Sequence, residues 1–276
     1  MPTVGAVRRH WGELASAAGV NPRDVDVLLG DVLEKPFSWI VAHEDDEIGA
    51  GRAALVQELM QRRLRREPLQ YIRGKTEFYR RDFLVDPRVL IPRPETEHLV
   101  EEASMRIARG ARVLDIGTGS GCVAISIALE RADLALFASD LSPAALAAAS
   151  ENAARLGARV RFFGSNVCES IGARARFGAI VSNPPYVPAW EVPELQEEVR
   201  DYEPPMALTP GETGLEVIER ILQRAPALLE PDGIMLFEIG YSQSASVARL
   251  GGAAGWIVEF VADLQGIPRV ALLSRA

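Results

Sequence analysis

A glycine-rich turn between two apolar segments restricts the fold of this chain more than any other feature of its sequence. Residues 112–116 form a strand-like run, Gly117-Thr118-Gly119-Ser120-Gly121 follows, and residues 122–129 form an apolar run of helical length. The next strand-like run, 135–139, ends at Asp140. Strand, tight turn, helix and strand in this order predict a βαβ unit, in which the two strands are parallel.

The turn is expected at the edge where open parallel sheets bind ligands. Ligands lie outside the carboxyl ends of the strands, and glycines allow the backbone to approach them closely. Asp140, about 20 residues beyond the glycines, is placed to accept hydrogen bonds from ribose hydroxyls. The spacing, however, is G-x-G-x-G rather than the G-x-G-x-x-G of dinucleotide sites, and Asp115 would repel a pyrophosphate.

Asp115 suits a cofactor that carries a positive group beside the glycine turn. S-adenosylmethionine has an ammonium group for Asp115, a ribose diol for Asp140 and an adenine ring. We therefore expect Asp115, the turn over residues 117–121 and Asp140 to bind this cofactor. The alternative is that Asp115 is a strand-end carboxylate that caps the turn and contacts no ligand.

A second motif, Asn183-Pro184-Pro185-Tyr186, follows the strand-like run at residues 178–182. Two consecutive prolines hold φ at about −65° and donate no backbone hydrogen bonds, which leaves a stiff arc of carbonyl acceptors. Asn183 and a carbonyl of Pro184 or Pro185 can accept both N–H bonds of a planar NH₂ group, and Tyr186 can cover its flat face. A rigid loop after a strand is the alternative, because two prolines commonly end a strand.

The segments between the two motifs alternate between helix and strand. Ser142-Pro143 predicts the start of a helix that reaches Leu156, since serine is a good N-cap and proline suits the first turn. Residues 159–163 and 178–182 have the composition of strands. We therefore expect Asn183 to face the same crevice as the glycine turn, where it contacts both the cofactor and the amine that receives the methyl group.

Together the two motifs resemble the class I, Rossmann-like methyltransferases that act on an amide or amine nitrogen. Three further segments, 67–72, 76–79 and 89–97, resemble the protein-(glutamine-N5) methyltransferases of bacterial peptide chain release factors, the PrmC/HemK family. The likeness runs from about Glu67 to the C-terminus. Its Ile-Pro-Arg-Pro-Glu-Thr-Glu stretch is much more specific than Asn-Pro-Pro-Tyr, which DNA adenine methyltransferases share.

The resemblance implies an α/β fold with a seven-stranded, mostly parallel sheet and S-adenosyl-L-methionine as cofactor. It implies that the substrate is the glutamine of the Gly-Gly-Gln motif in release factors 1 and 2. The family usually has an acidic residue near the adenine after the third strand, and this chain has Asn166 there, followed by Val167. Asn166 can still donate and accept hydrogen bonds, and Val167 offers a packing wall without stacking.

The chain is expected to contain two domains joined by a linker. Residues 1–73 show helical periodicity and predict a small helical bundle, which the resemblance identifies as a docking domain for the release factor. Residues 74–92 predict a β-hairpin linker, and residues 93–276 the methyltransferase domain. The proline-rich, acidic stretch 187–214 follows the second motif, so we expect it to form one wall of the substrate site.

Composition and charge indicate which kinds of molecule the protein can bind. The net charge of −8 over 276 residues argues against a general nucleic-acid binder. The arginines at positions 62, 63, 65 and 66 form a local basic cluster, which is either a solvated helix face or a docking surface for a partner or RNA. We expect no metal, because the three histidines are scattered, and no membrane segment, because no apolar run approaches about 18 residues. We also expect a cytoplasmic monomer without stably bound nucleic acid.

Two other functions remain open at this point. The second motif also permits an N-methyltransferase that acts on adenine in DNA or RNA, or on a glutamine of a ribosomal protein. A non-catalytic cofactor-binding protein with a decayed site is the third possibility. The intact Asn183 and glycine turn argue against decay.

Overall fold

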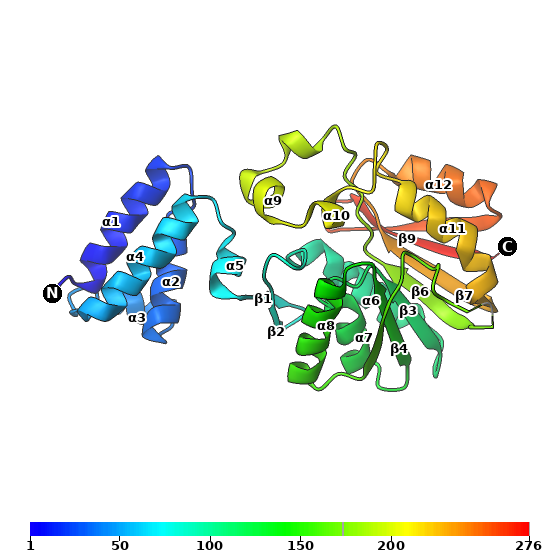
Figure 1. The fold of residues 1–276 in the computed structure, drawn as a ribbon, viewed down its shortest axis with the longest axis horizontal. Coiled ribbons are helices and arrows are strands. Elements are labelled where there is room, and N and C mark those ends of the chain that lie inside the picture. Colours follow the sequence, from blue (N-terminus) through cyan, green and yellow to red (C-terminus); the bar gives the residue numbers. More distant parts are fainter. Residues whose placement is uncertain (173, 276) are drawn as a thin grey trace. The chain divides into compact units, whose positions relative to one another are not determined.

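The computed structural model describes residues 1–172 and 174–275, and this part of the chain divides into two compact units. Unit 1 contains Met1–Lys75 together with Gln196–Tyr202, and unit 2 contains Thr76–Leu195 and the residues from Glu203 onward. A short segment from the second half of the chain thus belongs to the N-terminal unit. Each unit has a hydrophobic core of its own (Figure 1).

Unit 1 is a bundle of short helices. They are α1 (Val4–Ala17), α2 (Asp24–Leu33), α3 (Phe37–Ala42), α4 (Ala50–Leu64), α5 (Leu69–Arg73) and α9 (Glu197–Tyr202). Thr3 caps α1 by accepting a hydrogen bond from the Ala6 amide. Apolar residues at helical spacing place one face of α1 in the core, namely Val4, Val7, Trp11 and Ala15.

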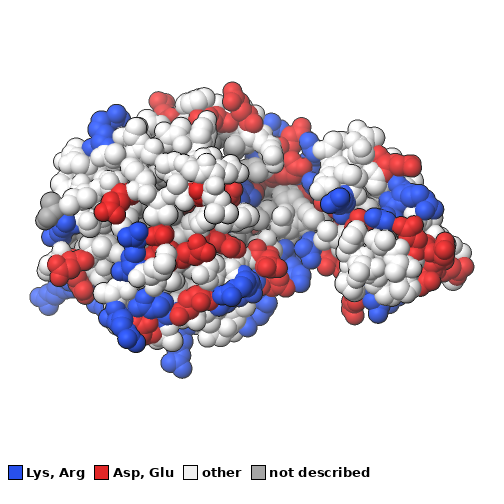
Figure 2. Space-filling model, turned by 180° about the vertical axis from the view of Figure 1, so that it is seen from behind, with Lys and Arg blue, Asp and Glu red and all other residues white. Residues whose placement is uncertain are grey.

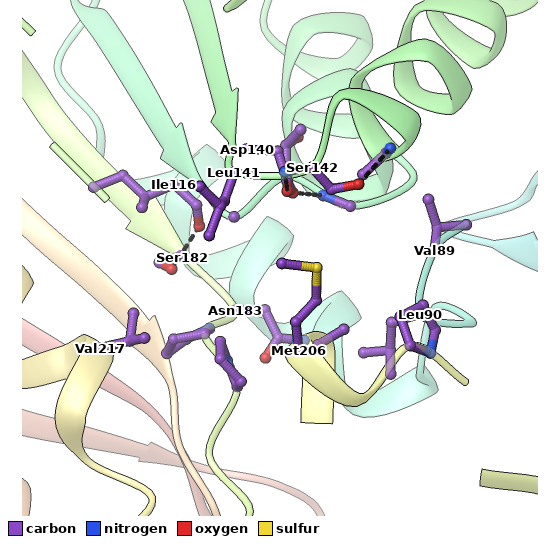
Figure 3. A pocket seen from close by; sticks show the side chains of 18 of the residues that line it. Val89, Leu90, Ile116, Asp140, Leu141, Ser142, Ser182, Asn183, Met206 and Val217 are labelled. Carbon is purple, nitrogen blue, oxygen red and sulfur yellow. Dashed lines mark hydrogen bonds between the residues drawn. The ribbon is translucent and has the colours of Figure 1, made fainter. Parts of the chain in front are cut away.

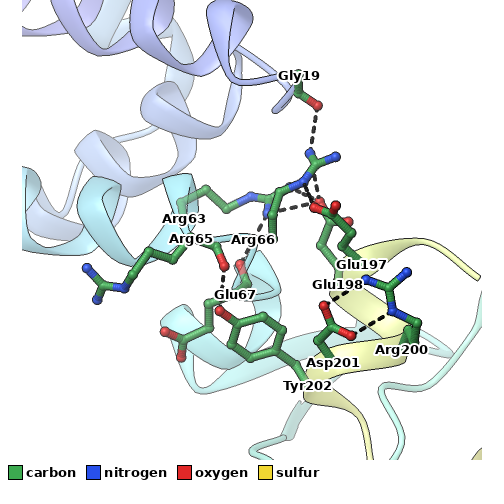
Figure 4. A network of polar contacts seen from close by, with 10 residues as sticks. All are labelled: Gly19, Arg63, Arg65, Arg66, Glu67, Glu197, Glu198, Arg200, Asp201 and Tyr202. Carbon is green, nitrogen blue, oxygen red and sulfur yellow. Dashed lines mark hydrogen bonds and ion pairs between the residues drawn. The ribbon is translucent and has the colours of Figure 1, made fainter.

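Arg62, Arg63 and Arg66 of the arginine cluster at the end of α4 are paired with acidic side chains of the same unit, and Figure 4 shows the pairs of Arg63 and Arg66. Arg63 Nε lies 2.7 Å from Asp24 Oδ2, and Arg63 Nη2 lies 3.1 Å from Glu198 Oε1. Arg66 Nε lies 2.8 Å from Glu197 Oε2. These ion pairs fasten α9 to the end of α4, so Arg63 and Arg66 are engaged within the unit rather than presented as free charges.

Unit 2 is built around a seven-stranded sheet in the order β5-β4-β3-β6-β7-β9-β8. The strands are β3 (Arg112–Ile116), β4 (Ala135–Asp140), β5 (Val160–Gly164), β6 (Phe177–Ser182), β7 (Leu229–Glu238), β8 (Trp256–Ala262) and β9 (Pro268–Arg275). The pairs from β5 to β7 are parallel, and β9 runs antiparallel to both β7 and β8. The predicted α/β fold with a mostly parallel seven-stranded sheet is confirmed.

Helices cover both faces of this sheet. They are α6 (Glu97–Arg106), α7 (Cys122–Glu130), α8 (Pro143–Leu156), α11 (Glu216–Leu228) and α12 (Ser244–Ala253), with the shorter η1 (Pro94–Thr96), η2 (Val192–Glu194) and α10 (Pro205–Leu208). Helices α6, α7 and α8 lie on one side of the sheet, and α11 and α12 lie on the other (Figure 1). Successive residues of β3 point to opposite layers, since Val113 belongs to the core cluster with residues of α6, α7 and α8, and Leu114 to the cluster with residues of α11 and α12. Ser142 caps α8 as predicted, accepting from the Ala145 amide.

A short hairpin precedes the sheet. Strands β1 (Lys75–Phe78) and β2 (Arg81–Leu84) are joined by Tyr79 and Arg80, whose φ values of 48° and 61° are those of a tight hairpin turn. Phe78 and Phe83 are buried against the sheet, with ring centroids 5.9 Å apart. The hairpin therefore packs on the sheet of unit 2 just before the Ile-Pro-Arg-Pro-Glu-Thr-Glu stretch.

Candidate active site

A cavity of about 300 Å³ lies in unit 2 at the carboxyl edge of the parallel strands. Both sequence motifs contribute to its walls, and Asn183 and Met206 lie across it from Asp140 and Leu141 (Figure 3). The predicted site residues that line it are Asp115, Gly117, Thr118, Gly119, Ser120, Asp140, Asn166, Val167, Asn183, Pro184 and Pro185. Gly121 and Tyr186 are not among the described residues that line the cavity.

The strand register explains why the two motifs meet. Strands β3 and β6 are parallel neighbours, and Ile116 pairs with Ser182 at their carboxyl ends. The Ser182 hydroxyl also donates a 2.7 Å hydrogen bond to the Ile116 carbonyl. The next residues of the two strands, Gly117 and Asn183, therefore begin two adjacent walls of one cavity.

The three glycines of the turn have different physical roles. Gly117, Gly119 and Gly121 all have positive φ, at 73°, 54° and 81°. A Cβ at Gly117 or Gly119 would meet no atom within 4 Å, so these positions leave open space for a ligand. A Cβ at Gly121 would lie 2.7 Å from Ile125 Cδ1, so this glycine serves the packing of α7 rather than the cavity.

Asp140 is held by the backbone at the end of β4. Its Oδ2 accepts from the Gly119 amide over 2.9 Å, and its Oδ1 accepts from the Ser142 amide over 2.9 Å. Each carboxylate oxygen has a further lone pair, so both can accept one more hydrogen bond from a ligand. Asp140 thus fixes the glycine turn and still offers acceptors to the cavity.

Asp115 is a buried carboxyl group that faces the cavity and is 1% exposed. The Thr118 hydroxyl donates a 2.7 Å hydrogen bond to Asp115 Oδ2. Burial raises the pKa of Asp115 to about 7, repulsion from Asp140 adds to this, and the Thr118 hydrogen bond opposes it. Asp115 therefore holds the Thr118 side chain of the turn and also presents a group whose ionised form a bound cation would favour.

Asn183 is oriented by a residue of the Ile-Pro-Arg-Pro-Glu-Thr-Glu stretch. Its Nδ2 donates a 3.0 Å hydrogen bond to Oγ1 of Thr96, which ends η1 and is 1% exposed. Because the amide nitrogen is engaged there, the Asn183 Oδ1 atom remains the acceptor for a group in the cavity. An acceptor oxygen facing the cavity is what binding of an NH₂ group requires.

Tyr186 is held by residues beside the cavity, at the far end of the motif from Asn183. Its hydroxyl donates to Glu238 Oε1 over 3.4 Å, and its carbonyl accepts from Gln243 Nε2 over 3.0 Å. Burial raises the pKa of Tyr186, with repulsion from Glu238 contributing. The predicted role of Tyr186 over the acceptor group stays a prediction, while its observed contacts anchor the end of the motif.

The wall opposite the glycine turn comes from the stretch that the sequence predicted as a long loop. Pro204, Met206 and Pro210 line the cavity, so part of 187–214 does bound the site. This stretch is not one loop, because it contains η2, α9 and α10, and its residues 196–202 belong to unit 1.

Glu203 is a buried support of the cavity wall that sequence reasoning missed. Its side chain is 1% exposed and accepts a 2.6 Å hydrogen bond from Arg93 Nη2. Glu203 Oε2 also accepts from the Ile91 amide over 3.3 Å. These contacts fasten the wall that begins at Pro204 to the stretch that carries Thr96. Nothing in the sequence distinguished Glu203 from the other acids of this segment.

The described residues also bear on whether the chain has a reactive cysteine, a metal site or a membrane span. Burial raises the pKa of the Cys122 thiol to about 12, so this cavity residue is not an activated nucleophile. Among residues 1–172 and 174–275, no group of three or more His, Cys, Asp or Glu side chains could hold a metal ion. Over the same residues, no helix has both the length and the apolar character needed to cross a bilayer.

The fold and the matched domains place the protein in the class of Rossmann-like methyltransferases. A model described as the methyltransferase small domain matches residues 94–197, and a model of the PrmC N-terminal domain matches residues 7–74. The chain belongs to the family of release factor glutamine methyltransferases. The resemblance found in its sequence is thereby confirmed.

Relatives agree with this assignment, and solved structures share the fold. The chain is 42% identical to the release factor glutamine methyltransferase of Koribacter versatilis, over 93% of this chain and 92% of that protein. It is 47% identical to that of Neisseria gonorrhoeae, over 95% of this chain and 96% of that protein. A methyltransferase from Pyrococcus furiosus shares the fold with a TM-score of 0.54 at 19% identity, covering 71% of this chain and 89% of that one. A 16S rRNA methyltransferase from T. thermophilus in complex with AdoMet and guanosine has a TM-score of 0.53 at 18% identity, covering 73% and 50%.

Proposed function

We propose that this protein transfers a methyl group from S-adenosyl-L-methionine to the side-chain amide nitrogen, N5, of a glutamine in peptide chain release factors 1 and 2. The glutamine is that of the Gly-Gly-Gln motif. The observation that carries the proposal is the pairing of Ile116 with Ser182, which opens the glycine turn and Asn183 onto one cavity. The names of the relatives supply the class of substrate.

The cofactor would occupy the side of the cavity formed by the glycine turn. Asp115 offers a carboxyl group for the ammonium, and Asp140 offers acceptors for the ribose diol. Asn166 and Val167 line the same cavity and would bound the adenine. The AdoMet complex of a protein with this fold supports the choice of cofactor.

The acceptor amide would be held by the second motif. A carboxamide nitrogen is a weak nucleophile because its lone pair is delocalised into the carbonyl. Asn183 Oδ1 and a carbonyl of Pro184 or Pro185 would accept its two N–H bonds and so direct the nitrogen lone pair into the cavity. The sulfonium of the bound cofactor supplies an electrophilic methyl group, so the protein's main contribution is positioning.

Positioning of this kind can make a large contribution to the rate. Well-oriented reactants can lower a barrier by on the order of 7–11 kcal/mol. Once methylated, the nitrogen is acidic and loses its proton to solvent or a nearby acceptor. A dedicated general base is therefore not required, and Asn183 acts by orientation rather than by proton transfer.

The charge distribution favours a protein substrate over DNA or RNA. Lys and Arg side chains are interspersed with Asp and Glu over the face shown in Figure 2, and the chain carries a net charge of −8. Nucleic-acid binding relies on clustered positive charge. We propose that the protein acts as a monomer in the cytoplasm, and that the helical unit 1 helps to dock the release factor.

A transfer assay tests this function. The protein is incubated with methyl-labelled cofactor and purified release factor, and a parallel sample contains the Gln→Ala variant of that release factor. Label on the normal factor alone supports the proposal. Label on DNA, RNA or a ribosomal protein instead would select another substrate class, and cofactor binding with no transfer would identify a non-catalytic protein.

A further inference from the structure

Gln243 is a buried side-chain amide that is hydrogen-bonded to the far end of the Asn-Pro-Pro-Tyr segment. It stands at the start of α12 and is 7% exposed. Its Nε2 donates to the Tyr186 carbonyl over 3.0 Å and to the Gly214 carbonyl over 3.1 Å. Its Oε1 accepts from the Gly240 amide over 3.0 Å. One side chain therefore joins three segments: the end of the motif, the stretch before α11 and the turn after β7.

These three contacts fix which way the amide faces. A glutamine side chain has two N–H donors on its nitrogen and an oxygen that only accepts. Both donors of Gln243 meet carbonyl oxygens, and its oxygen meets a backbone N–H. If the amide turned over, its oxygen would face two carbonyls and its NH₂ group would face a donor. Only one of the two orientations satisfies all three partners.

Two glycines make room for these contacts. Gly214 has a φ of 78°, and a Cβ there would clash with the Tyr186 carbonyl oxygen and lie 3.0 Å from Gln243 Nε2. A Cβ at Gly240 would lie 3.2 Å from Gln243 Oε1 and 3.4 Å from Tyr186 Cδ2. The backbone of both segments therefore approaches the Gln243 amide and Tyr186 more closely than a residue with a side chain allows.

The two prolines of the motif make its end contacts important. Pro184 and Pro185 line the cavity, but they have no N–H to donate, and their rings hold φ at about −65°. No backbone donor of their own can fasten this stiff arc, so its orientation depends on the residues at its two ends. At the first end, Asn183 Nδ2 donates a 3.0 Å hydrogen bond to Thr96 Oγ1.

At the second end, the Tyr186 carbonyl is held by Gln243. This 3.0 Å bond has the usual length of an N–H···O bond, whereas the Tyr186 hydroxyl reaches Glu238 only over 3.4 Å. The next amide, Val187, donates to the Leu208 carbonyl over 3.0 Å. Loss of Gln243 would therefore loosen this end of the arc without freeing it.

We propose that Gln243 is a positioning residue for methyl transfer: by holding the Tyr186 carbonyl it fixes the carbonyls of Pro184 and Pro185 for the acceptor amide. The inference rests on the proposed function, because that function assigns one of these two carbonyls to the substrate NH₂ group. Gln243 is not among the described residues that line the cavity, so it acts through Tyr186.

Steady-state kinetics of the full-length protein with release factor test the inference. Gln243→Leu removes all three hydrogen bonds at nearly constant size. Gln243→Asn withdraws the amide from its partners by one methylene, yet keeps a favoured residue at the N-cap of α12. Both should lower kcat by about 10- to 100-fold, as a small misplacement of a reacting group does. Gln265→Leu, which changes an exposed glutamine in the turn before β9, should match the wild type.

Cofactor affinity separates positioning from a general loss of structure. By calorimetry, it should stay within about threefold of the wild type in both variants, because neither Gln243 nor its partners belong to the glycine turn. The inference is overturned if either variant is folded by thermal unfolding and turns over at the wild-type rate. It is also overturned if cofactor affinity falls as much as kcat.

A measurement on the wild type needs neither a variant nor turnover. Because both N–H groups of Gln243 are engaged, hydrogen exchange of its side-chain NH₂ group, followed by NMR, should be much slower than that of the exposed Gln265. Equal exchange at the two side chains would overturn the inference even if neither variant folded. Absence of methyl transfer by the wild type, together with slow exchange at Gln243, would contradict the proposed function and leave the anchor of the motif in place.

Discussion

The two sides of the cavity are built in different ways. On the cofactor side, the glycine turn and Asp140 hold each other through backbone amides, and the residues involved lie close together in sequence. On the acceptor side, Asn183 is oriented by Thr96, which lies 87 residues earlier, and the wall is fastened by the pair of Arg93 and Glu203, 110 residues apart.

The cofactor side is therefore held mainly by local contacts, whereas the acceptor side depends on contacts between residues far apart in the sequence. The cofactor side is fixed mainly by one turn, which Asp140 at the end of the next strand holds through the Gly119 amide. The acceptor side needs η1, the end of β7 and the stretch after β6 to be in place together. We expect changes on the cofactor side to alter cofactor binding or stability, and changes on the acceptor side to alter turnover.

The largest expected effect tests the acceptor side. Asn183→Ala removes the amide oxygen that would accept from the substrate NH₂ group, and should lower kcat by about 10²- to 10³-fold. Cofactor affinity by calorimetry should stay close to that of the wild type. Gln265→Ala, in an exposed turn, is the matched control for loss of an amide. A large loss of cofactor affinity in Asn183→Ala would place this residue on the cofactor side and break the comparison.

The second prediction contrasts two glycines of the same turn. Gly121→Ala places a Cβ 2.7 Å from Ile125 Cδ1 at a φ of 81°, so it should lower the free energy of unfolding by about 2–4 kcal/mol. Gly119→Ala meets open space at a φ of 54° and should cost about 1–2 kcal/mol.

Gly121→Ala should lose more stability, whereas Gly119→Ala should lose more cofactor affinity. Denaturant unfolding and calorimetry measure stability and affinity separately. Gly119→Ala fills space at the cavity and should weaken cofactor binding more than its effect on folding requires. Equal losses of stability in the two variants would contradict the assignment of Gly121 to packing and Gly119 to ligand contact.

The sequence predicted the backbone around the glycine turn well because that backbone is determined locally. Glycines at a strand-to-helix junction, an acid at the next strand end and a Ser-Pro helix start each restrict the backbone within a few residues. The structure accordingly has β3 at Arg112–Ile116, as expected, and three glycines with positive φ.

The supports of the acceptor side could not be predicted in the same way. Nothing in the sequence near Glu203 or Glu238 indicates that one pairs with Arg93 and the other faces Tyr186. The assignment of residues 196–202 to unit 1 depends on ion pairs such as Arg66 to Glu197, across 131 positions. Periodicity and composition carry no information on which distant charges will meet.

The third prediction concerns the pH dependence of cofactor binding. Asp115 has a pKa of about 7 in the folded protein, above its usual 3.8, so the folded protein binds an extra proton between these values. Stability should therefore fall as the pH rises through this window. Cofactor affinity should rise with pH up to about 7, by at most about tenfold per pH unit, because an ammonium favours the ionised carboxylate.

Asp115→Asn is the variant that checks this dependence by calorimetry. It keeps the shape of the side chain but cannot ionise, so its cofactor affinity should be low and nearly constant between about pH 5.5 and 7. An unchanged pH dependence in this variant would assign the titration to another group. It would also return Asp115 to the role of a cap for the glycine turn.

The smallest expected effect concerns the wall of the acceptor side. Glu203→Gln keeps an acceptor for the Ile91 amide but removes the charge that Arg93 contacts at 2.6 Å. Because a polar contact survives, we expect a loss of about 1 kcal/mol, seen as a three- to tenfold rise in the KM for the release factor. Cofactor affinity should not change. Glu212→Gln, an exposed acid of the same stretch, is the control. If Glu203→Gln weakened cofactor binding as much as it raised KM, the wall would serve both ligands, and the two sides of the cavity would not be independent.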